Sequence, residues 1–257
     1  ISIRKILQQH CQSIEILAFD CVPGYMFDQG KIGSNSSTSI TQRVAVLNSI
    51  IGEPLKSVKS SRYIRWQGEE RNSLFSQIKS LVIDKKFVSH YQWPVLGEYE
   101  EKRMFSLMNK SERTIGDLVN KDGKLSLFIP DSTRYFISAV RYDLKRGQKL
   151  LNFTNPSERN LAQIIINSDL FYWYWRATDG GFSVNLGGLK SIPLPSIDNQ
   201  QRYEKEINNM ANRLHRNAKS CEVIKENKGP KRNVKYDKKP DLMQDLNRLI
   251  CQIYGFE

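Results

Sequence analysis

Residues 155–175 read NPSERNLAQIIINSDLFYWYW, and this stretch predicts two consecutive helices at the centre of the fold. Ser157 follows Asn-Pro and is a candidate N-cap for the first helix. The apolar positions of that helix are Leu161, Ile164 and Ile165. Ser168 is a candidate N-cap for the second helix, in which residues 170–175 are all apolar or aromatic. Because these rings surround the helix on every side, we expect it to be buried on more than one face.

Two longer amphipathic helices are predicted toward the C-terminus, at residues 203–220 and 241–254. The apolar stripe of the first comprises Ile207, Met210, Leu214 and Ala218. The apolar stripe of the second comprises Leu242, Leu246, Leu249, Ile250 and Ile253. Upstream of the central helices, residues 125–129 and 135–140 are candidate strands. This half of the chain therefore reads as an α+β arrangement.

The first fifty residues predict a short helix, a strand, a loop and a second strand. The helix begins at Ile3 and the first strand covers residues 14–19, while residues 30–39 are rich in Gly, Ser and Asn and form a loop. Residues 42–51 are apolar and β-branched, which predicts a buried strand. Too little sequence precedes these strands to complete a sheet, so we expect them to be the edge of a larger one.

Composition favours a soluble, cytoplasmic protein with a real core. The chain has 257 residues, of which 39% are hydrophobic, and this excludes wholesale disorder. Its longest apolar run, residues 170–175, is far shorter than the roughly 20 residues of a membrane span. The four cysteines contain no Cys-x-x-Cys pair and the three histidines have no second ligand at a suitable spacing, so we predict buried free thiols and no metal site.

The charge balance indicates a polyanionic partner. Lys and Arg number 39 against 27 Asp and Glu, a formal net charge of +12, and such a surplus favours nucleic-acid phosphates. Residues 134–149 hold five basic groups and one acid among aromatic residues, a mixture suited to a nucleic-acid surface. Residues 219–239 hold eight basic groups and three acids and resemble a connector. The alternative is a charged face that only keeps the protein soluble.

Four patches, in this order, resemble the C-terminal half of the adenine-N6 DNA methyltransferases of restriction–modification systems, particularly the type IIG enzymes. They are FDCVPGYMF (19–27) with QRVAVL (42–47); SRYIRW (61–66) with EERNSLF (69–75); NSDLFYWYW (167–175) with TDGGFSVN (178–185) and LKSIPLP (189–195); and LICQIYG (249–255). In that family the first patch resembles a late catalytic-domain motif and the third lies in the target-recognition region.

The resemblance implies a fold that mixes α/β and α+β parts. Residues 1–55 would be the edge of a methyltransferase Rossmann-like sheet, the C-terminal remnant of the catalytic domain. Residues 56–200 would be the α+β target recognition domain. Residues 201–257 would be C-terminal helices with a basic connector.

The implied function is sequence-specific recognition of duplex DNA, positioning a flipped adenine for methylation from S-adenosyl-L-methionine. The resemblance places Phe27 where the family stacks on the extruded base; the alternative for Phe27 is a core residue at the end of the sheet. The glycine-rich cofactor loop and the Asn-Pro-Pro-Tyr motif are both missing from the chain. We therefore assign no catalytic residue here and expect S-adenosylmethionine and the active site to be supplied by the missing N-terminal methyltransferase region, in the same polypeptide or a separate subunit.

The candidate DNA-binding residues are basic side chains from the two clusters and from the resemblance patches. They are Arg62, Arg65, Arg134, Arg141, Lys145, Arg146, Arg176, Lys190, Lys231 and Arg232. An arginine can read guanine in the major groove or only hold a phosphate, and the sequence leaves both roles open. Arg62, Arg65 and Trp66 could instead form a structural cluster with Glu69 and Glu70.

Two rival functions come from other classes of protein. A type I restriction specificity subunit would dock on separate modification subunits, but such subunits carry two similar halves and no repeat is present here. A generic RNA-binding or structural basic domain would show no preference for duplex DNA, and it leaves the Phe27 loop unexplained.

Overall fold

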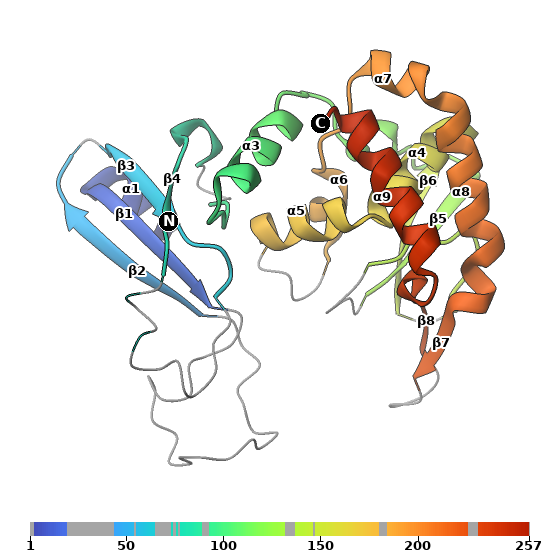
Figure 1. Ribbon diagram of the computed structural model, residues 1–257, viewed down its shortest axis with the longest axis horizontal. Helices are drawn as coiled ribbons and strands as arrows, with labels where there is room; N and C mark the ends of the chain where they lie inside the picture. Colours follow the sequence, from blue (N-terminus) through green and yellow to red (C-terminus); the bar gives the residue numbers. More distant parts are fainter. Residues whose placement is uncertain are drawn as a thin grey trace. The chain divides into compact units, whose positions relative to one another are not determined.

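The computed structural model describes residues 3–19, 44–53, 55–64, 73, 76, 78–88, 93–131, 137–145, 147–179, 184–225 and 231–256. The chain divides into two compact units, Ile1–Arg103 and Met104–Glu257. The division falls within helix α3 (Tyr99–Met108). Both units contain helices and strands (Figure 1), which confirms the mixed α and β class. The functional boundaries predicted at residues 55/56 and 200/201 stay predictions.

The first unit is built on a four-stranded mixed sheet. Its elements are α1 (Ile3–His10), β1 (Cys11–Phe19), β2 (Val44–Ile51), β3 (Ser57–Ser60), β4 (Leu81–Ile83) and the 3-10 turn η2 (Lys85–Phe87). The strand order is β2-β1-β3-β4. Strand β1 pairs antiparallel with β2 and parallel with β3, and β3 pairs antiparallel with β4. The sheet therefore continues past residue 55 into the segment that was assigned to target recognition.

The core of this unit lies on one face of the sheet. Ile14 and Ile16 are two residues apart on β1, and both pack with Cys11, Val58 and Trp93. This spacing is the period of two that a strand with one buried face requires. The predicted opening helix and first strand are thus confirmed, with the strand beginning three residues earlier than expected.

Strand β2 forms as predicted, but the prediction that it is buried is wrong. It stands at one end of the strand order, and Leu47, Ile50 and Ile51 are exposed. The side chain of Ile51 is the extreme case, at 86% exposure. An apolar, β-branched segment is typical of a central strand. Here the same composition occupies an edge, so its outer side meets no other described strand.

The second unit combines short strand pairs with a group of helices. Its strands are β5 (Leu125–Pro130) with β6 (Gln148–Phe153), and β7 (Glu222–Lys225) with β8 (Lys231–Val234), both pairs antiparallel. Its helices are α4 (Pro156–Ile166), α5 (Asp169–Asp179), α6 (Leu186–Lys190), α7 (Ile197–Arg202), α8 (Glu204–Ala218) and α9 (Pro240–Tyr254). Its described residues also form the 3-10 turns η3 (Ile115–Leu118), η4 (Lys219–Cys221) and η5 (Tyr236–Lys238).

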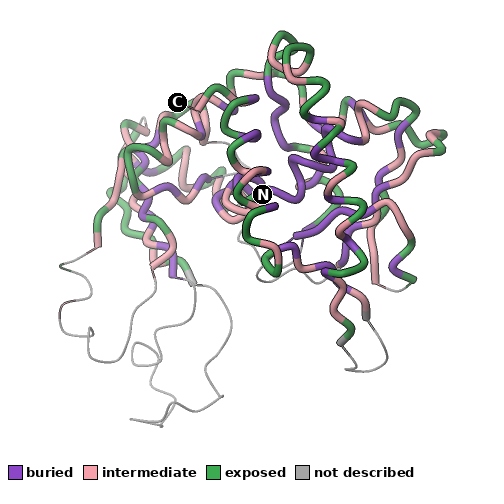
Figure 2. Tube along the Cα trace, turned by 45° about the vertical axis from the view of Figure 1, so that its right-hand side comes forward, coloured by how far each residue is buried: buried purple, intermediate pink, exposed green. Residues whose placement is uncertain are grey.

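Helix α4 forms the centre of this unit. Every residue from Asn160 to Ile166 is buried, and α4 contacts β5, β6, α5, α8 and α9. In Figure 2 the buried residues, in purple, gather where these elements meet. The rings of Phe171, Tyr174 and Trp175 on α5 are buried as predicted, and Phe105 stacks on Tyr174 at 5.4 Å between ring centroids. The predicted apolar stripes of α8 and α9 are confirmed residue by residue.

Two local predictions need correction, one is confirmed and one strand was missed. The N-cap of α4 is Asn155, whose side chain accepts from Ser157 N, because Pro156 already occupies the first helical position. The second predicted cap is confirmed, since Ser168 Oγ accepts from Phe171 N at 3.2 Å. In place of a strand at 135–140, described residues 137–140 make only a single bridge between Val140 and Phe128. Strand β6 was not predicted.

The cysteines are only partly as expected. Cys11 and Cys221 are free and buried, whereas Cys251 is free and exposed on α9, so the prediction of burial is wrong for that thiol. In the described part of the chain, none of the helices has the length and apolar character needed to cross a membrane.

Candidate nucleic-acid interface

The structure describes six of the eleven predicted site residues at side-chain level. Those outside the described residues are Phe27, Arg65, Arg134 and Arg146, and the side chain of Lys231 is also not described. Arg62 belongs to the first unit, and the second unit contains Arg141, Lys145, Arg176, Lys190 and Arg232.

Arg62 is held by an acid on its own unit. Its Nη1 lies 2.7 Å from Glu98 Oε1, and both side chains are largely exposed. The backbone at Arg62 packs closely against Gly97, where an added Cβ would lie 2.2 Å from Arg62 N. Because an exposed ion pair contributes little to stability and opens easily, this pair leaves the guanidinium within reach of a phosphate. In the structure, however, the Arg62 guanidinium forms an ion pair with Glu98.

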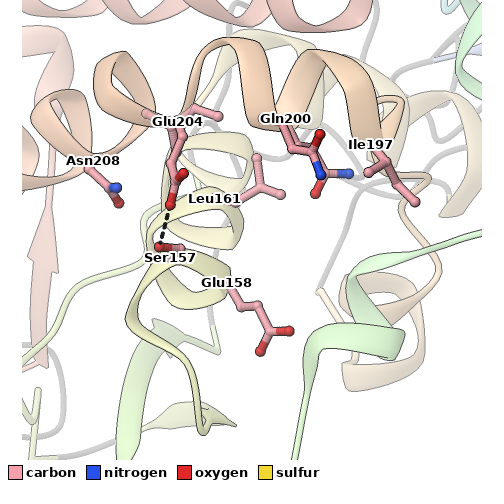
Figure 3. Close-up of a pocket in the computed structure, with 9 residues that line it drawn as sticks. Ser157, Glu158, Leu161, Ile197, Gln200, Glu204 and Asn208 are labelled. Atoms are coloured by element: carbon pink, nitrogen blue, oxygen red, sulfur yellow. Dashed lines mark hydrogen bonds between the residues drawn. The ribbon is translucent and has the colours of Figure 1, made fainter.

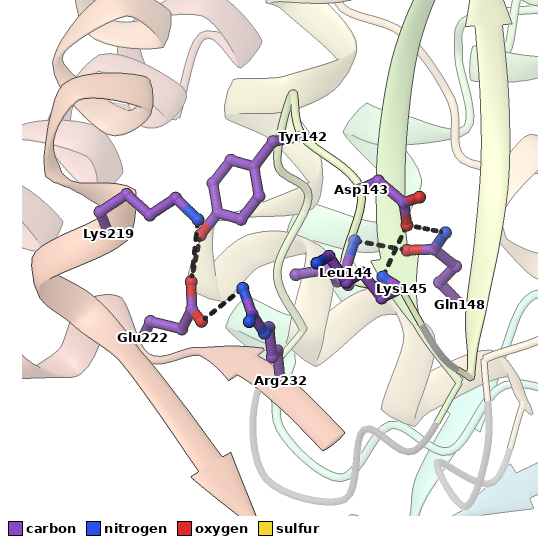
Figure 4. Close-up of polar contacts among 8 residues, drawn as sticks. All are labelled: Tyr142, Asp143, Leu144, Lys145, Gln148, Lys219, Glu222 and Arg232. Carbon is purple, nitrogen blue, oxygen red and sulfur yellow. Dashed lines mark hydrogen bonds and ion pairs between the residues drawn. The ribbon is translucent and has the colours of Figure 1, made fainter. Parts of the chain in front are cut away.

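The loop at residues 140–145 is pre-organised by Asp143 (Figure 4). Asp143 Oδ1 accepts from Lys145 N and from Gln148 Nε2, each at 2.6 Å, and Leu144 N donates to Gln148 Oε1 at 2.8 Å. The Lys145 backbone bond, followed by the Gln148 bond, holds the pKa of Asp143 below its usual value. Lys145 itself has a left-handed φ of 69° and is exposed. The loop therefore presents Lys145 from a fixed backbone.

Glu222 connects this loop to β8 and the end of α8 (Figure 4). Its carboxylate accepts from Tyr142 Oη at 3.2 Å and lies 3.4 Å from Lys219 Nζ and 3.5 Å from Arg232 Nη1. The Lys219 ammonium also stands 3.9 Å from the centroid of the Tyr142 ring. Burial and the Glu222 carboxylate raise the pKa of Tyr142 far above its ordinary value, so the phenol stays protonated. One carboxylate therefore contacts two cations, and it holds Arg232 close to Tyr142 of the loop at residues 140–145.

A row of polar contacts follows the seam between α4 and α8. Ser157 Oγ donates to Glu204 at 3.2 Å and Asn160 Nδ2 donates to Asn208 at 2.7 Å. One step further along, Arg141 donates to the α8 residue Asn212 at 2.9 Å. The residue numbers rise together on the two helices, so α4 and α8 run in the same direction.

The guanidinium group of Arg141 lies at the end of this row of polar contacts, between α4 and α8. Its Nε donates to Gln163 Oε1 at 2.7 Å and its Nη2 donates to Asn160 Oδ1 at 2.9 Å, in addition to the Asn212 bond. All three acceptors are neutral amides. Burial, then the charge of Arg159, lowers the pKa of Arg141 to about 10, so the guanidinium stays charged at neutral pH. The predicted site residue is therefore partly structural, and none of the described carboxylates forms an ion pair with it.

The remaining predicted cations lie on other elements of this unit. Arg176 on α5 stands over the ring of Tyr172, with its Cζ 6.0 Å from the centroid, and Lys190 ends α6. Nearby, Asp179 accepts from Trp175 Nε1 at 3.3 Å and from Asn185 Nδ2 at 3.2 Å, so this carboxylate joins the end of α5 to the cap of α6.

A small pocket lies at the other end of the α4–α8 seam (Figure 3). It has a volume of about 220 Å³, and its apolar wall includes Leu161 and Ile197. The carboxylates of Glu158 and Glu204 also line it, with Glu204 bonded to Ser157. Two acids without a lining cation would repel a phosphate. This pocket therefore does not belong to a nucleic-acid interface.

Residue-by-residue sequence reading missed Arg159, His215 and Asn212, which surround Arg141. The available signal was the helical spacing of amide residues, which is three between Asn160 and Gln163 on α4 and four between Asn208 and Asn212 on α8. Such spacing places side chains on one helix face. Within the described residues, no three His, Cys, Asp or Glu side chains gather closely enough to hold a metal ion.

Comparison with protein-family models and with curated proteins finds no match to this chain.

Proposed function

We propose that this chain is the duplex-DNA recognition portion of an adenine-N6 DNA methyltransferase of a restriction–modification system. The observation that carries the DNA-binding part is the uncancelled charge of Arg141. It bonds only neutral amides, beside a pre-organised loop that presents Lys145. Neither side chain forms a salt bridge with an acid in the described part of the chain. The charge of Arg141 has no described carboxylate partner, and such a charge is what a phosphate backbone binds. The exposed Lys145 adds a second cation, which lies near Asp143.

The methyltransferase part of the proposal is supported by the four ordered patches and by strand β2. An edge strand that exposes Leu47, Ile50 and Ile51 is a site for pairing with further protein. In a Rossmann-like domain a further strand would pair with the backbone of β2, and helices on the sheet faces would bury those side chains. The proposal therefore includes an N-terminal methyltransferase region that binds S-adenosylmethionine, and a cytoplasmic location, where restriction–modification enzymes meet DNA.

The target adenine would be swung out of the duplex and stacked on Phe27, which lies outside the described residues. An enzyme that modifies a base within a duplex needs an aromatic or apolar wall for the extruded base. The recognition surface on this chain would hold the flanking duplex, and the transferred methyl group would come from the cofactor of the parent enzyme.

The test is titration of the purified chain with duplex DNA at several salt concentrations. Phosphate contacts release counterions, so we expect an affinity that falls linearly in log–log form between about 50 and 200 mM salt. Single-stranded RNA of the same length serves as the comparison ligand. Absence of duplex binding, binding that does not respond to salt, or equal affinity for the RNA would overturn the proposed function.

A further inference from the structure

Two arginines of the second unit share a single acceptor atom. Asn160 Oδ1 accepts from Arg141 Nη2 at 2.9 Å and from Arg159 Nη2 at 3.1 Å. The two guanidinium groups can therefore be no farther apart, at their nearest nitrogens, than two hydrogen bonds laid end to end. Like charges repel strongly at such a separation when water is partly excluded. The fold accordingly holds two cations against their mutual repulsion.

Nothing negative in the described part of the chain compensates this pair. No described carboxylate forms an ion pair with either arginine, and the other acceptors of Arg141 are the amides of Gln163 and Asn212. The Nε of Arg159 is buried and has no hydrogen-bond partner among the described residues. Buried donors are nearly always satisfied in folded proteins, because an unpaired one costs free energy. Two half-buried guanidinium groups on one acceptor, without a described carboxylate beside them, indicate a place for an anion.

A third group of the same cluster is His215, in the last turn of α8. Burial, followed by the charges of Arg141 and Arg159, lowers the pKa of His215 below its usual value. At neutral pH the imidazole is thus uncharged and can donate one N–H without adding to the repulsion. Arg141 bonds Asn212, which lies one helical turn before His215 on α8, so His215 lies on the side of α8 that faces the two arginines.

We infer that Arg141, Arg159 and His215 form a seat for one phosphate group of the DNA backbone. This inference rests on the proposed function, because it assumes that duplex DNA is the ligand. Guanidinium groups donate to phosphate oxygens in pairs, and a phosphodiester bound to the half-buried guanidinium groups would offset one of the two positive charges. A phosphate contact carries no sequence information, so the seat fixes the register of the duplex and supplies affinity.

The experiment compares Arg159→Gln with Arg213→Gln in the whole chain. Both variants remove one positive charge, but the Arg213 guanidinium is already paired with Asp245 at 2.8 Å. For Arg159→Gln we expect about a tenfold loss of affinity for random duplex DNA at low salt and a salt slope shallower by about 1. Arg213→Gln should keep both quantities close to the wild-type values. Arg141 is unsuitable for this test because three amides depend on it for hydrogen bonds.

A second measurement tests the seat without DNA. Inorganic phosphate should raise the thermal unfolding midpoint of the wild-type chain and of Arg213→Gln above that in chloride of equal ionic strength, and should not do so for Arg159→Gln. Circular dichroism verifies that each variant folds. Equal protection of all three proteins, or no protection of any, overturns the seat.

The two hypotheses fail in different ways. A wild-type chain that does not bind duplex DNA overturns the proposed function, and the phosphate measurement then decides alone whether the seat exists. If the wild-type chain binds DNA in a salt-dependent manner and Arg159→Gln binds like Arg213→Gln, the seat is overturned and the proposed function stands.

Discussion

At the scale of single residues, the hydrogen-bond partners of Arg141 determine how much its substitution changes the free energy of unfolding. Its fork spans Asn160, Gln163 and Asn212, and lysine cannot reproduce that planar geometry. We expect Arg141→Lys to lower the free energy of unfolding by about 1–3 kcal/mol, because at least one buried amide oxygen loses its donor. Urea denaturation measures this change.

The control for that prediction is Arg62→Lys in the first unit. The Arg62–Glu98 pair is exposed, so this variant should change the free energy of unfolding by less than about 0.5 kcal/mol. Equal effects of the two substitutions would show that the amides around Arg141 do not depend on its fork.

Two carboxyl groups predict opposite responses to pH. Bonds from Lys145 N and Gln148 lower the pKa of Asp143 in the folded state, so it contributes stability above the unfolded pKa of about 3.9. That contribution is lost as the pH falls through the lower folded value. Burial raises the pKa of Asp179, so the folded state favours the protonated form and loses stability as the pH rises from the unfolded to the folded value.

The variants Asp143→Asn and Asp179→Asn separate these effects. At pH 7 we expect Asp143→Asn to lower the thermal unfolding midpoint. Asp179→Asn should leave the midpoint unchanged or raise it, because its amide oxygen can still accept from Trp175 and Asn185. Midpoints recorded from acid to neutral pH test both signs. A lower midpoint for Asp179→Asn at pH 7 would contradict the raised pKa.

At the scale of elements, the start of α4 gives a prediction with a built-in comparison. Asn155 accepts from Ser157 N at 2.8 Å and is the N-cap, whereas the Ser157 hydroxyl makes only an exposed contact with Glu204. We expect Asn155→Ala to lower the free energy of unfolding by about 1 kcal/mol. Ser157→Ala should cost less, and chemical denaturation of the two variants decides the assignment. The reverse order would restore Ser157 as the cap.

Strand β2 predicts how this chain behaves when no other protein covers its edge. Ile51 is exposed, so Ile51→Lys should change the free energy of unfolding by less than about 0.5 kcal/mol. The same charge on an edge strand opposes strand pairing between molecules. Light scattering should therefore show less self-association for the variant than for the wild-type chain at equal concentration. Unchanged scattering would mean that this edge is not where the molecules associate.

Whether a segment forms a helix or a strand could be predicted wherever one periodicity dominates. Its neighbours in the fold could not be predicted. The stripes of α8 and α9 repeat at helical spacing along one face, so their buried residues follow from the sequence alone. Strand β2 is apolar on both faces, which indicates a strand but not whether neighbours cover it. Strand β6 combines exposed Leu150 with polar Gln148 and Asn152, and its pairing with β5 is a tertiary choice.

At the scale of the whole molecule, only part of the candidate site could be predicted from the sequence. The excess of basic residues at 134–149 identified Arg141 because charge density is a local property of the sequence. Arg159 and His215 sit on helices read as core elements, and only the packing of α4 against α8 brings them to Arg141. Phe27 and the methyltransferase function depend on the resemblance, so they remain predictions.

The proposed function assigns methyl transfer to a larger parent enzyme and not to this chain alone. The reaction needs the exocyclic amine fixed by carbonyl acceptors beside the cofactor sulfonium, which this chain has no motif to provide. We expect the chain alone, with S-adenosylmethionine and duplex DNA, to incorporate no labelled methyl group. When the chain is joined to an upstream region that carries a glycine-rich loop and an Asn-Pro-Pro-Tyr motif, it should methylate adenine.

In that longer protein, Phe27→Ala should reduce methylation by at least about tenfold while duplex affinity stays unchanged, because stacking acts on the extruded base only. Methylation by the isolated chain would refute this division of labour, and full activity of Phe27→Ala would refute the stacking role alone.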